Sequence, residues 1–271
     1  MLQTVQRAAQ VLRLFTPEQA EWGVTEVAAA LGLPKSGAHS LLSTLASEGL
    51  LQRMPGGRYR LGWSLFEHSQ TLLETTDFLL IARRVMEQLV AGWGETTHLA
   101  VLIDGQVLYV EKLQGDRALE IVLSRVGKRL PAHCSGVGKV LLAHRPWEEV
   151  LAIVKRQGLP SLTPNTITSI DRLRIELEEV RLQGFAYDQE EVMVGLCCAA
   201  APIRDETGEV IAALSLSVPA YRFYPYRQRL TTAVIEAAQH VSMQLGYYVE
   251  TPEWTKPKRS GSRSAAWATR A

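Results

Sequence analysis

The sequence has no long run of apolar residues. No stretch approaches the roughly 20 apolar residues that a helix needs to span a bilayer, and the opening residues, 1–7, lack the apolar core of a signal peptide. We therefore expect a cytoplasmic protein with no membrane anchor.

Cysteine and net charge are also scarce. The three cysteines, Cys134, Cys197 and Cys198, form no Cys-x-x-Cys pair, and the two neighbours cannot easily bridge each other. This usage fits a reducing compartment. The formal net charge is only +1, so any nucleic-acid surface must be a local basic patch rather than a property of the whole molecule.

The motifs of catalysis are missing as well. There is no Gly-x-Ser-x-Gly elbow, no phosphate-binding loop and no short spacing of metal ligands. We therefore expect no catalysis, no metal and no cofactor. The alternative, a Cys–His hydrolase or a metal site, would have to recruit dispersed residues, namely His98, His133, Cys134, Asp188 and Cys198.

What is present is enough chain for two domains of ordinary size, at 271 residues. A hydrophobic fraction of 46% and a charged fraction of 21% are typical of a globular protein with a real core. The patterns along the chain indicate where the two domains lie.

The first 62 residues carry the pattern of a winged helix-turn-helix. Residues 4–15 place apolar side chains at helical spacing, and a short second helix opens at Thr25 and stops at Gly32. A third helix begins near Pro34, which suits a first turn. Residues 50–61 then read as a β-hairpin around a Pro-Gly-Gly turn.

In such an arrangement the third helix enters the major groove of DNA, and its small polar face allows close approach. The helix start favours a phosphate, and arginines on the hairpin are placed to touch the backbone as a wing. The pattern alone leaves open a three-helix bundle with an ordinary polar face. The predicted DNA contacts are Lys35, Ser36, His39, Ser40, Ser43, Arg53, Arg58 and Arg60.

The rest of the chain mixes strands and helices. Residues 63–91 form one or two helices, after which strands are expected at 98–103, 107–111 and 119–123. This order favours an α+β sensor-like domain with a mixed or antiparallel sheet. Further helices are expected at 135–144, 147–157, 169–183 and 226–248, and further strands at 185–190, 196–203 and 210–218.

A series of short motifs runs in order along residues 3–248. They include Val-Gln-Arg-Ala-Ala-Gln-Val-Leu from Val5, Gly-Leu-Pro-Lys-Ser from Gly32, Gly-Lys-Val-Leu-Leu-Ala from Gly138 and Asp-Gln-Glu-Glu from Asp188. Together they resemble the isocitrate-lyase-regulator (IclR) family of transcriptional regulators. The resemblance implies a winged helix-turn-helix, a linker helix, and a GAF-like domain that binds small organic acids. It also implies dimers or dimers of dimers.

The patterns and the resemblance together divide the chain into four expected segments. The DNA-binding domain is expected at 1–62, the linker helix at 63–78 and the effector-binding domain at 79–250. The remaining segment, 251–271, is expected to be a disordered basic tail, either simply solvated or adding weak affinity for DNA.

The recognition helix departs from the family pattern at two positions. Gly37 stands where the family commonly has Thr, and Ser40 stands where it commonly has Arg. Glycine within a helix costs about 1 kcal/mol relative to alanine, and the missing arginine removes a bidentate contact to guanine or phosphate. The departures bear on the operator sequence rather than on DNA binding itself.

The resemblance also implies an effector pocket. Ser215 and Ser217 are two apart on an otherwise apolar strand, so both hydroxyls point to one face, although a solvated face is the alternative. Amides at a helix start opposite such hydroxyls would hold a carboxylate. Of Cys197 and Cys198 at most one can reach the pocket. By resemblance the contacts are Ser135, Gly136, Val137, Asp188, Cys198, Ser215 and Ser217.

We therefore expect a homo-oligomeric regulator that binds double-stranded operator DNA and responds to a small carboxylate effector. The alternative is a regulator that ignores ligands and uses its C-terminal domain only to oligomerise. That alternative predicts no rise in melting temperature with any ligand.

Overall fold

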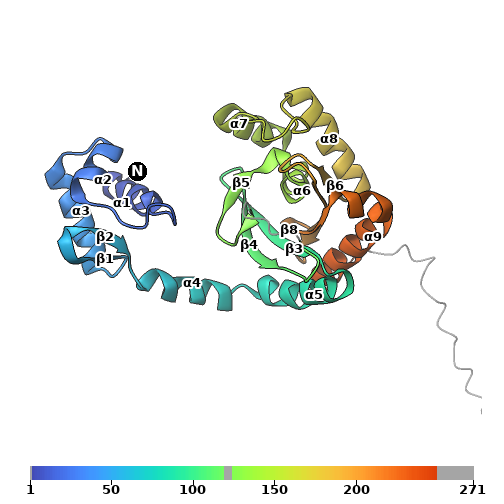
Figure 1. The fold of residues 1–271 in the computed structure, drawn as a ribbon, viewed down its shortest axis with the longest axis horizontal. Coiled ribbons are helices and arrows are strands. Elements are labelled where there is room, and N and C mark those ends of the chain that lie inside the picture. Colours follow the sequence, from blue (N-terminus) through green and yellow to red (C-terminus); the bar gives the residue numbers. More distant parts are fainter. Residues whose placement is uncertain (1, 119–123, 249–271) are drawn as a thin grey trace, which may run out of the picture. The chain divides into compact units, whose positions relative to one another are not determined.

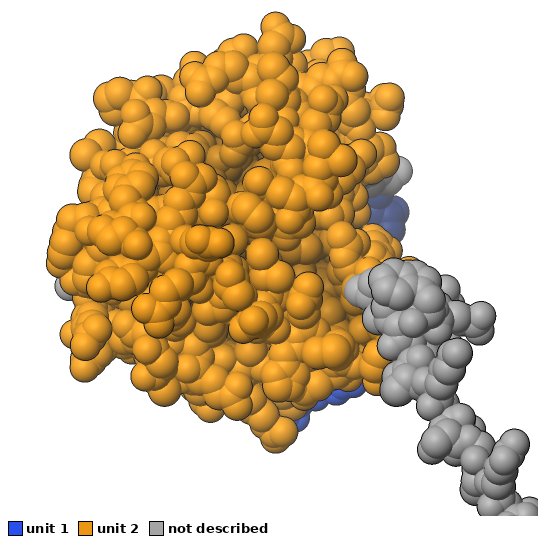
Figure 2. Space-filling view, turned by 90° about the vertical axis from the view of Figure 1, so that its right-hand side faces the viewer, with its two compact units in different colours: residues 1–77 blue, residues 78–271 orange. Residues whose placement is uncertain are grey.

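The computed structural model describes residues 2–118 and 124–248. The chain falls into two compact units, residues 1–77 and residues 78–271, which are coloured separately in Figure 2. The predicted strand at 119–123 and the predicted tail at 251–271 lie outside the described residues.

The first unit is a small helical bundle with a two-stranded wing. Apolar side chains on one side of each helix gather in a core that includes Val11, Val27, Leu42 and Tyr59. In chain order the elements are α1 (Gln3–Leu14), α2 (Val24–Leu31), α3 (Lys35–Ser47), β1 (Leu51–Arg53), the 3-10 turn η1 (Pro55–Gly57), β2 (Tyr59–Leu61) and α4 (Ser64–Glu74).

The start of α2 differs from the prediction. The N-cap is Gly23 rather than Thr25, and the Glu26 carboxylate accepts a hydrogen bond from the Gly23 amide at 2.7 Å. The Glu26 carboxylate thus supplies the half of a capping box that a glycine at the cap position still permits, because only the backbone amide of that residue is needed for it. The helix ends as predicted at Gly32, which adopts a left-handed conformation with φ of 62°.

The predicted linker helix over 63–78 is interrupted. Helix α4 ends at Glu74, and α5 (Asp77–Trp93) begins three residues later. Between them the hydroxyls of Thr75 and Thr76 donate to carbonyls of the preceding turn. Such bonds from a hydroxyl back to the helix compete with helix continuation, which accounts for the break.

The second unit is built on one sheet. Six antiparallel strands follow the order β5-β4-β3-β8-β7-β6, so the antiparallel alternative of the prediction is the observed one. The strands are β3 (Thr96–Ile103), β4 (Gln106–Leu113), β5 (Arg129–Pro131), β6 (Ala186–Gln189), β7 (Leu196–Arg204) and β8 (Val210–Pro219).

Helices cover both faces of this sheet (Figure 1). One face packs on α5 and α9 (Ala220–Gln244). The other face packs directly on α6 (Gly136–Ala143), around which the sheet curls, and α7 (Trp147–Gln157) and α8 (Ile170–Gln183) contribute to the same hydrophobic core. A helical N-terminal unit followed by a sheet with helices confirms the predicted α+β class.

Helix α9 begins earlier than the predicted start at 226. Pro225 lacks an amide hydrogen, yet the helix continues through it from Ala220. Phe223 is fully buried in the core beneath the sheet, and this packing outweighs one lost backbone hydrogen bond. Within residues 2–118 and 124–248, no helix is both long and apolar enough to cross a membrane.

Candidate functional site

Four neighbouring strands bring polar side chains into one row across the sheet. Asp188 pairs with Cys198, Cys198 with Ser217, and Ser217 with Thr96. Residues paired directly across strands point to the same face of a sheet. The row therefore lies on one face, and it joins residues that are up to 121 positions apart in the chain.

The next row along the same face makes room for helix α6. It contains Ala200, Ser215 and His98. A Cβ atom built on Gly136, at the start of α6, would lie 3.2 Å from the Ala200 Cβ and 2.8 Å from the Cys198 Sγ. Glycine and alanine at the contact thus allow the helix start to sit directly on the sheet.

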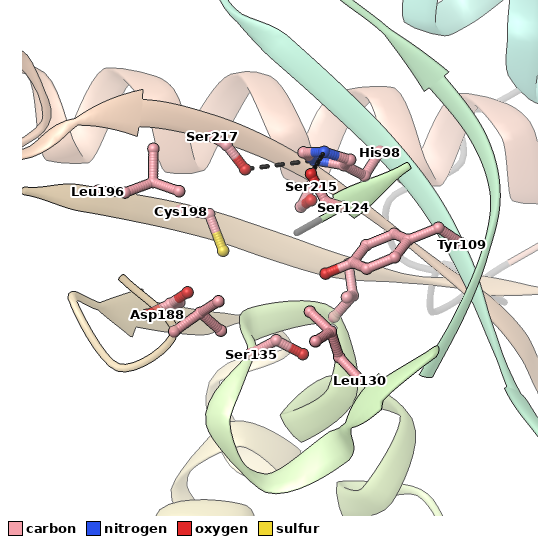
Figure 3. Close-up of a pocket in the computed structure, with 12 residues that line it drawn as sticks. His98, Tyr109, Ser124, Leu130, Ser135, Asp188, Leu196, Cys198, Ser215 and Ser217 are labelled. Atoms are coloured by element: carbon pink, nitrogen blue, oxygen red, sulfur yellow. Dashed lines mark hydrogen bonds between the residues drawn. The ribbon is translucent and has the colours of Figure 1, made fainter. Parts of the chain in front are cut away.

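A cavity of about 20 Å³ lies between these rows and α6 (Figure 3). A space of that size holds about one or two water molecules. It is lined by six of the predicted effector contacts: Ser135, Val137, Asp188, Cys198, Ser215 and Ser217. Lining residues that were not predicted as effector contacts are His98, Tyr109, Ser124, Leu130, Val192 and Leu196.

The start of α6 presents backbone amides to this cavity. Ser135 is the N-cap, and its hydroxyl accepts a hydrogen bond from the Gly138 amide at 3.1 Å. The Gly136 amide, the seventh predicted contact, faces the Cys198 thiol. The positive end of the helix therefore lies beside the sheet row, which favours a negatively charged or strongly accepting group there.

Asp188 is the one carboxylic acid among the described residues that line the cavity. It is 4% exposed, and burial raises its pKa from the ordinary value to about 7. The amide of Glu191 donates to its Oδ1 at 2.7 Å and opposes the shift. Close to neutral pH the side chain therefore exists in both protonation states.

Lys139 forms a buried ion-pair cluster behind Asp188. Its Nζ lies 2.6 Å from Glu191 Oε1 and 2.6 Å from Glu176 Oε1, although its side chain is only 1% exposed. Burial opposes the ammonium charge, but the two carboxylates together hold the pKa of Lys139 above its ordinary value. The cluster links α6 and α8 to the turn that follows β6. Asp188 lies on β6 itself.

The residues of the hydrolase alternative are not arranged for catalysis. Burial raises the pKa of the Cys134 thiol to about 12 and moves the pKa of the Cys198 thiol upward as well, so neither forms the reactive thiolate near neutral pH. His133 is bonded to the Pro160 carbonyl rather than to a cysteine. In the described part of the chain, no three His, Cys, Asp or Glu side chains are placed to hold a metal ion.

The predicted DNA contacts lie on the first unit. Lys35, Ser36, His39 and Ser40 are exposed along α3, while Ser43 is half-buried. The opposite side of the helix carries the core residues Ala38, Leu42 and Leu45. A polar face of small side chains is therefore left accessible, as a recognition helix requires.

The three hairpin arginines differ from one another. Arg53 is exposed, whereas Arg58 pairs with Glu26 at 2.9 Å and donates to the Glu21 carbonyl at 2.8 Å. Arg60 donates to Gln52 Oε1 across the hairpin at 2.8 Å. Arg58 thereby holds the wing against the start of α2, a role that the sequence did not indicate.

Comparison with known families decides between the interpretations. Residues 4–55 match the family described as the IclR helix-turn-helix domain, and residues 70–243 match the C-terminal part of the bacterial transcriptional regulator IclR. The chain belongs to the IclR family. The predicted family resemblance is confirmed.

Individual IclR-family proteins support this assignment. The HTH-type transcriptional regulator XynR of Escherichia coli is 38% identical over 80% of this chain and 86% of its own. The transcriptional repressor IclR of E. coli is 31% identical over 90% of each chain. The crystal structure of an IclR homologue from Microbacterium hydrocarbonoxydans, in complex with 4-hydroxybenzoate, covers 89% of this chain with a TM-score of 0.78 and 29% identity.

Sequence reasoning considered His98 only as a residue of the hydrolase alternative and did not consider Tyr109 or Lys139 as site residues. A signal for His98 exists, because His98 and Thr96 are polar side chains two positions apart on a strand whose later residues are apolar. Lys139 gave no comparable signal, since lysine near a helix start is usually solvated.

Proposed function

We propose that this IclR-family chain binds operator DNA through α3 and the wing, and that a small carboxylate bound between α6 and the sheet changes its operator affinity. The observation that carries the proposal is the concentration of buried polar side chains on one face of the sheet, around a cavity. Burying such groups is unfavourable unless they find partners. Ser135, Ser217 and Asp188 each have a partner within the protein and keep further hydrogen-bonding capacity, which a ligand in the cavity would engage.

Neutral donors would hold the carboxylate. The described lining contains hydroxyls from Ser135, Ser215 and Ser217, but no lysine or arginine. The α6 amides add partial positive charge at the same end. An acid can therefore bind without a cation, provided that Asp188 takes up a proton and does not repel it.

The size of the cavity links binding to a structural change. A space of about 20 Å³ accommodates water but not an organic acid, so the walls must separate when an acid binds. The contact of Gly136 with Cys198 and Ala200 lies at this wall. An acid that stabilises the separated arrangement would shift the equilibrium toward it, and a coupling of about 1–3 kcal/mol suffices to alter operator occupancy.

The decisive experiment is a titration of the full chain against the DNA upstream of its own gene, at fixed salt. The titration is repeated with a panel of small aliphatic and aromatic carboxylates that includes 4-hydroxybenzoate. We expect tight sequence-selective binding that at least one acid shifts by about 5- to 150-fold. In the double variant Ser215→Ala, Ser217→Ala, the DNA should still bind but the acid should lose its effect.

Thr232→Ala serves as the matched control, because it removes an exposed hydroxyl from α9 of the same unit. It should leave the response to the acid intact. DNA binding that no acid alters would favour the regulator whose C-terminal domain only oligomerises. Absence of sequence-selective binding would contradict the DNA half of the proposal.

The affinity for the acid should depend on pH. The pKa of Asp188 is about 7, so the protonated form dominates at pH 6 and the ionised form at pH 8. If only protonated Asp188 tolerates a carboxylate beside it, acid affinity falls about tenfold between these two values. The acid itself, with a pKa of roughly 4, stays ionised over the whole range.

Calorimetric titration at pH 6, 7 and 8 measures this dependence. The titratable rings that line the cavity do not mimic it, since His98 has a pKa of about 3 and the pKa of Tyr109 is raised far above neutrality. The Asp188→Asn variant should bind the acid with the same affinity at all three pH values. Affinity that is flat or rises with pH in the unaltered protein contradicts this role for Asp188.

A further inference from the structure

His98 is bonded by a serine hydroxyl on each of its ring nitrogens. Its Nε2 lies 2.8 Å from Ser124 Oγ and its Nδ1 lies 3.3 Å from Ser217 Oγ (Figure 3). The ring is 2% exposed, and the Tyr109 ring packs on it with 5.2 Å between centroids. Both partners are hydroxyls rather than carboxylates, which distinguishes this histidine from a charged one.

A histidine in these surroundings is neutral. Burial lowers the pKa of His98 to about 3, and the charge of Lys112 adds to the effect. A neutral imidazole carries one proton, so one nitrogen donates while the other accepts. The two serines must therefore play opposite roles toward the ring.

The position of that proton fixes what Ser217 offers to the cavity. With the proton on Nδ1, the ring donates to Ser217 Oγ, and the Ser217 hydroxyl hydrogen is released for an acceptor in the cavity. With the proton on Nε2, the Ser217 hydroxyl donates to Nδ1, and only its lone pairs face the cavity. Ser217 lines the cavity, so either state is presented directly to a bound molecule.

We propose that His98 is a specificity-determining residue whose tautomer adapts Ser217 to either a hydrogen-bond acceptor or a hydrogen-bond donor on the effector. The inference rests on the proposed function, because it concerns the same cavity. It assigns to the effector a second polar group besides its carboxylate. A keto acid selects the proton on Nδ1, and the matching hydroxy acid selects the proton on Nε2.

Both states of the ring are satisfied in the structure, which is what a switch requires. Ser124 can donate to Nε2 or accept from it at 2.8 Å, and Ser217 can do the same at Nδ1. Asparagine or glutamine at this position would fix one donor and one acceptor by its packing. A histidine exchanges the two roles by moving only a proton.

The test is the ¹⁵N spectrum of the full chain labelled at histidine, with His98→Gln used to identify the His98 signals. In Ser217→Ala, Nδ1 loses its partner, and because a buried N–H without an acceptor is unfavourable, the proton should reside on Nε2. In Ser124→Ala the proton should move to Nδ1. Signals that do not differ between these variants overturn the proposal.

Pyruvate and lactate are the probes for the ligand arm, because they share one carbon skeleton and differ only in a keto and a hydroxyl group. We expect pyruvate to move the His98 signals toward those of Ser124→Ala and lactate to move them toward those of Ser217→Ala. Movement in the same direction with both acids, or no movement with either, contradicts the tautomer switch and leaves a structural core histidine.

A binding measurement gives an independent readout. His98→Phe keeps a ring in the core but removes both nitrogens. The dissociation constants for pyruvate and lactate should therefore become more nearly equal. His98→Gln provides a second variant should the first fail to fold. A ratio that neither variant changes counts against the proposal. Failure of the proposed function can be distinguished from failure of this inference. It would appear in the operator titration as DNA binding that no acid of the panel alters.

Discussion

Replacing Lys139 by Met is expected to lower the free energy of unfolding by about 3–5 kcal/mol, the usual cost of removing one partner from a buried ion pair. The ammonium group is 1% exposed and is shared by Glu191 and Glu176. The second oxygen of Glu191, Oε2, is buried and already has no hydrogen-bond partner. Without Lys139 the whole carboxylate would be left uncompensated.

The measurement is urea unfolding of the full chain, followed by circular dichroism. Glu178→Gln is the matched control, because it breaks a pair with Arg174 at 3.0 Å on the same α8, where both side chains are exposed. The control should change the free energy of unfolding by less than about 0.5 kcal/mol. A loss in Lys139→Met no larger than this would show that the cluster is well solvated.

A double variant separates charge from packing. Adding Glu191→Leu to Lys139→Met removes the unpaired buried carboxylate, so a large part of the lost stability should return. The effector response should not return with it. The amide of Glu191 donates a hydrogen bond of 2.7 Å to the Asp188 carboxylate. The position of that amide depends on the ion pair between the Glu191 side chain and Lys139 of α6.

The sequence predicted the members of the cavity better than their arrangement. Alternation along one strand placed Ser215 and Ser217 on a common face, and the structure has both lining the cavity. The strand register, however, decides that Cys198 lies between Asp188 and Ser217. Register depends on contacts between distant segments, and a single sequence carries little information on it.

Side chains with two possible partners were the hardest to predict. Arg58 was expected to contact DNA as part of the wing, yet in the structure it is engaged by Glu26 and the Glu21 carbonyl. Whether it also reaches a phosphate stays a prediction. Lys139 could not be predicted as buried, because its two carboxylate partners are 37 and 52 positions away in the chain.

Replacing Gly138 by Ala is expected to destabilise the chain by about 3 kcal/mol, at the upper end of the range for overpacking. A Cβ atom at this position would lie 2.1 Å from the Ala132 carbonyl oxygen, and its two next contacts are also backbone atoms of Ala132. Backbone cannot rotate aside as a flexible side chain can. The turn at Ala132–Cys134 or the start of α6 must therefore move.

Gly92→Ala is the matched control, because Gly92 lies within helix α5 and a Cβ there would meet nothing within 4 Å. Alanine should stabilise that helix by about 0.5–1 kcal/mol. The two substitutions should change the stability in opposite directions. Thermal unfolding measures both changes and distinguishes close packing from helix propensity.

A shift of the α6 start would also separate the Gly136 and Val137 amides from the sheet row. Gly138→Ala should therefore lose the response to every acid, while Gly92→Ala keeps it. Equal stability of the two variants, with the response intact in both, would mean that α6 does not need this close approach to form the cavity.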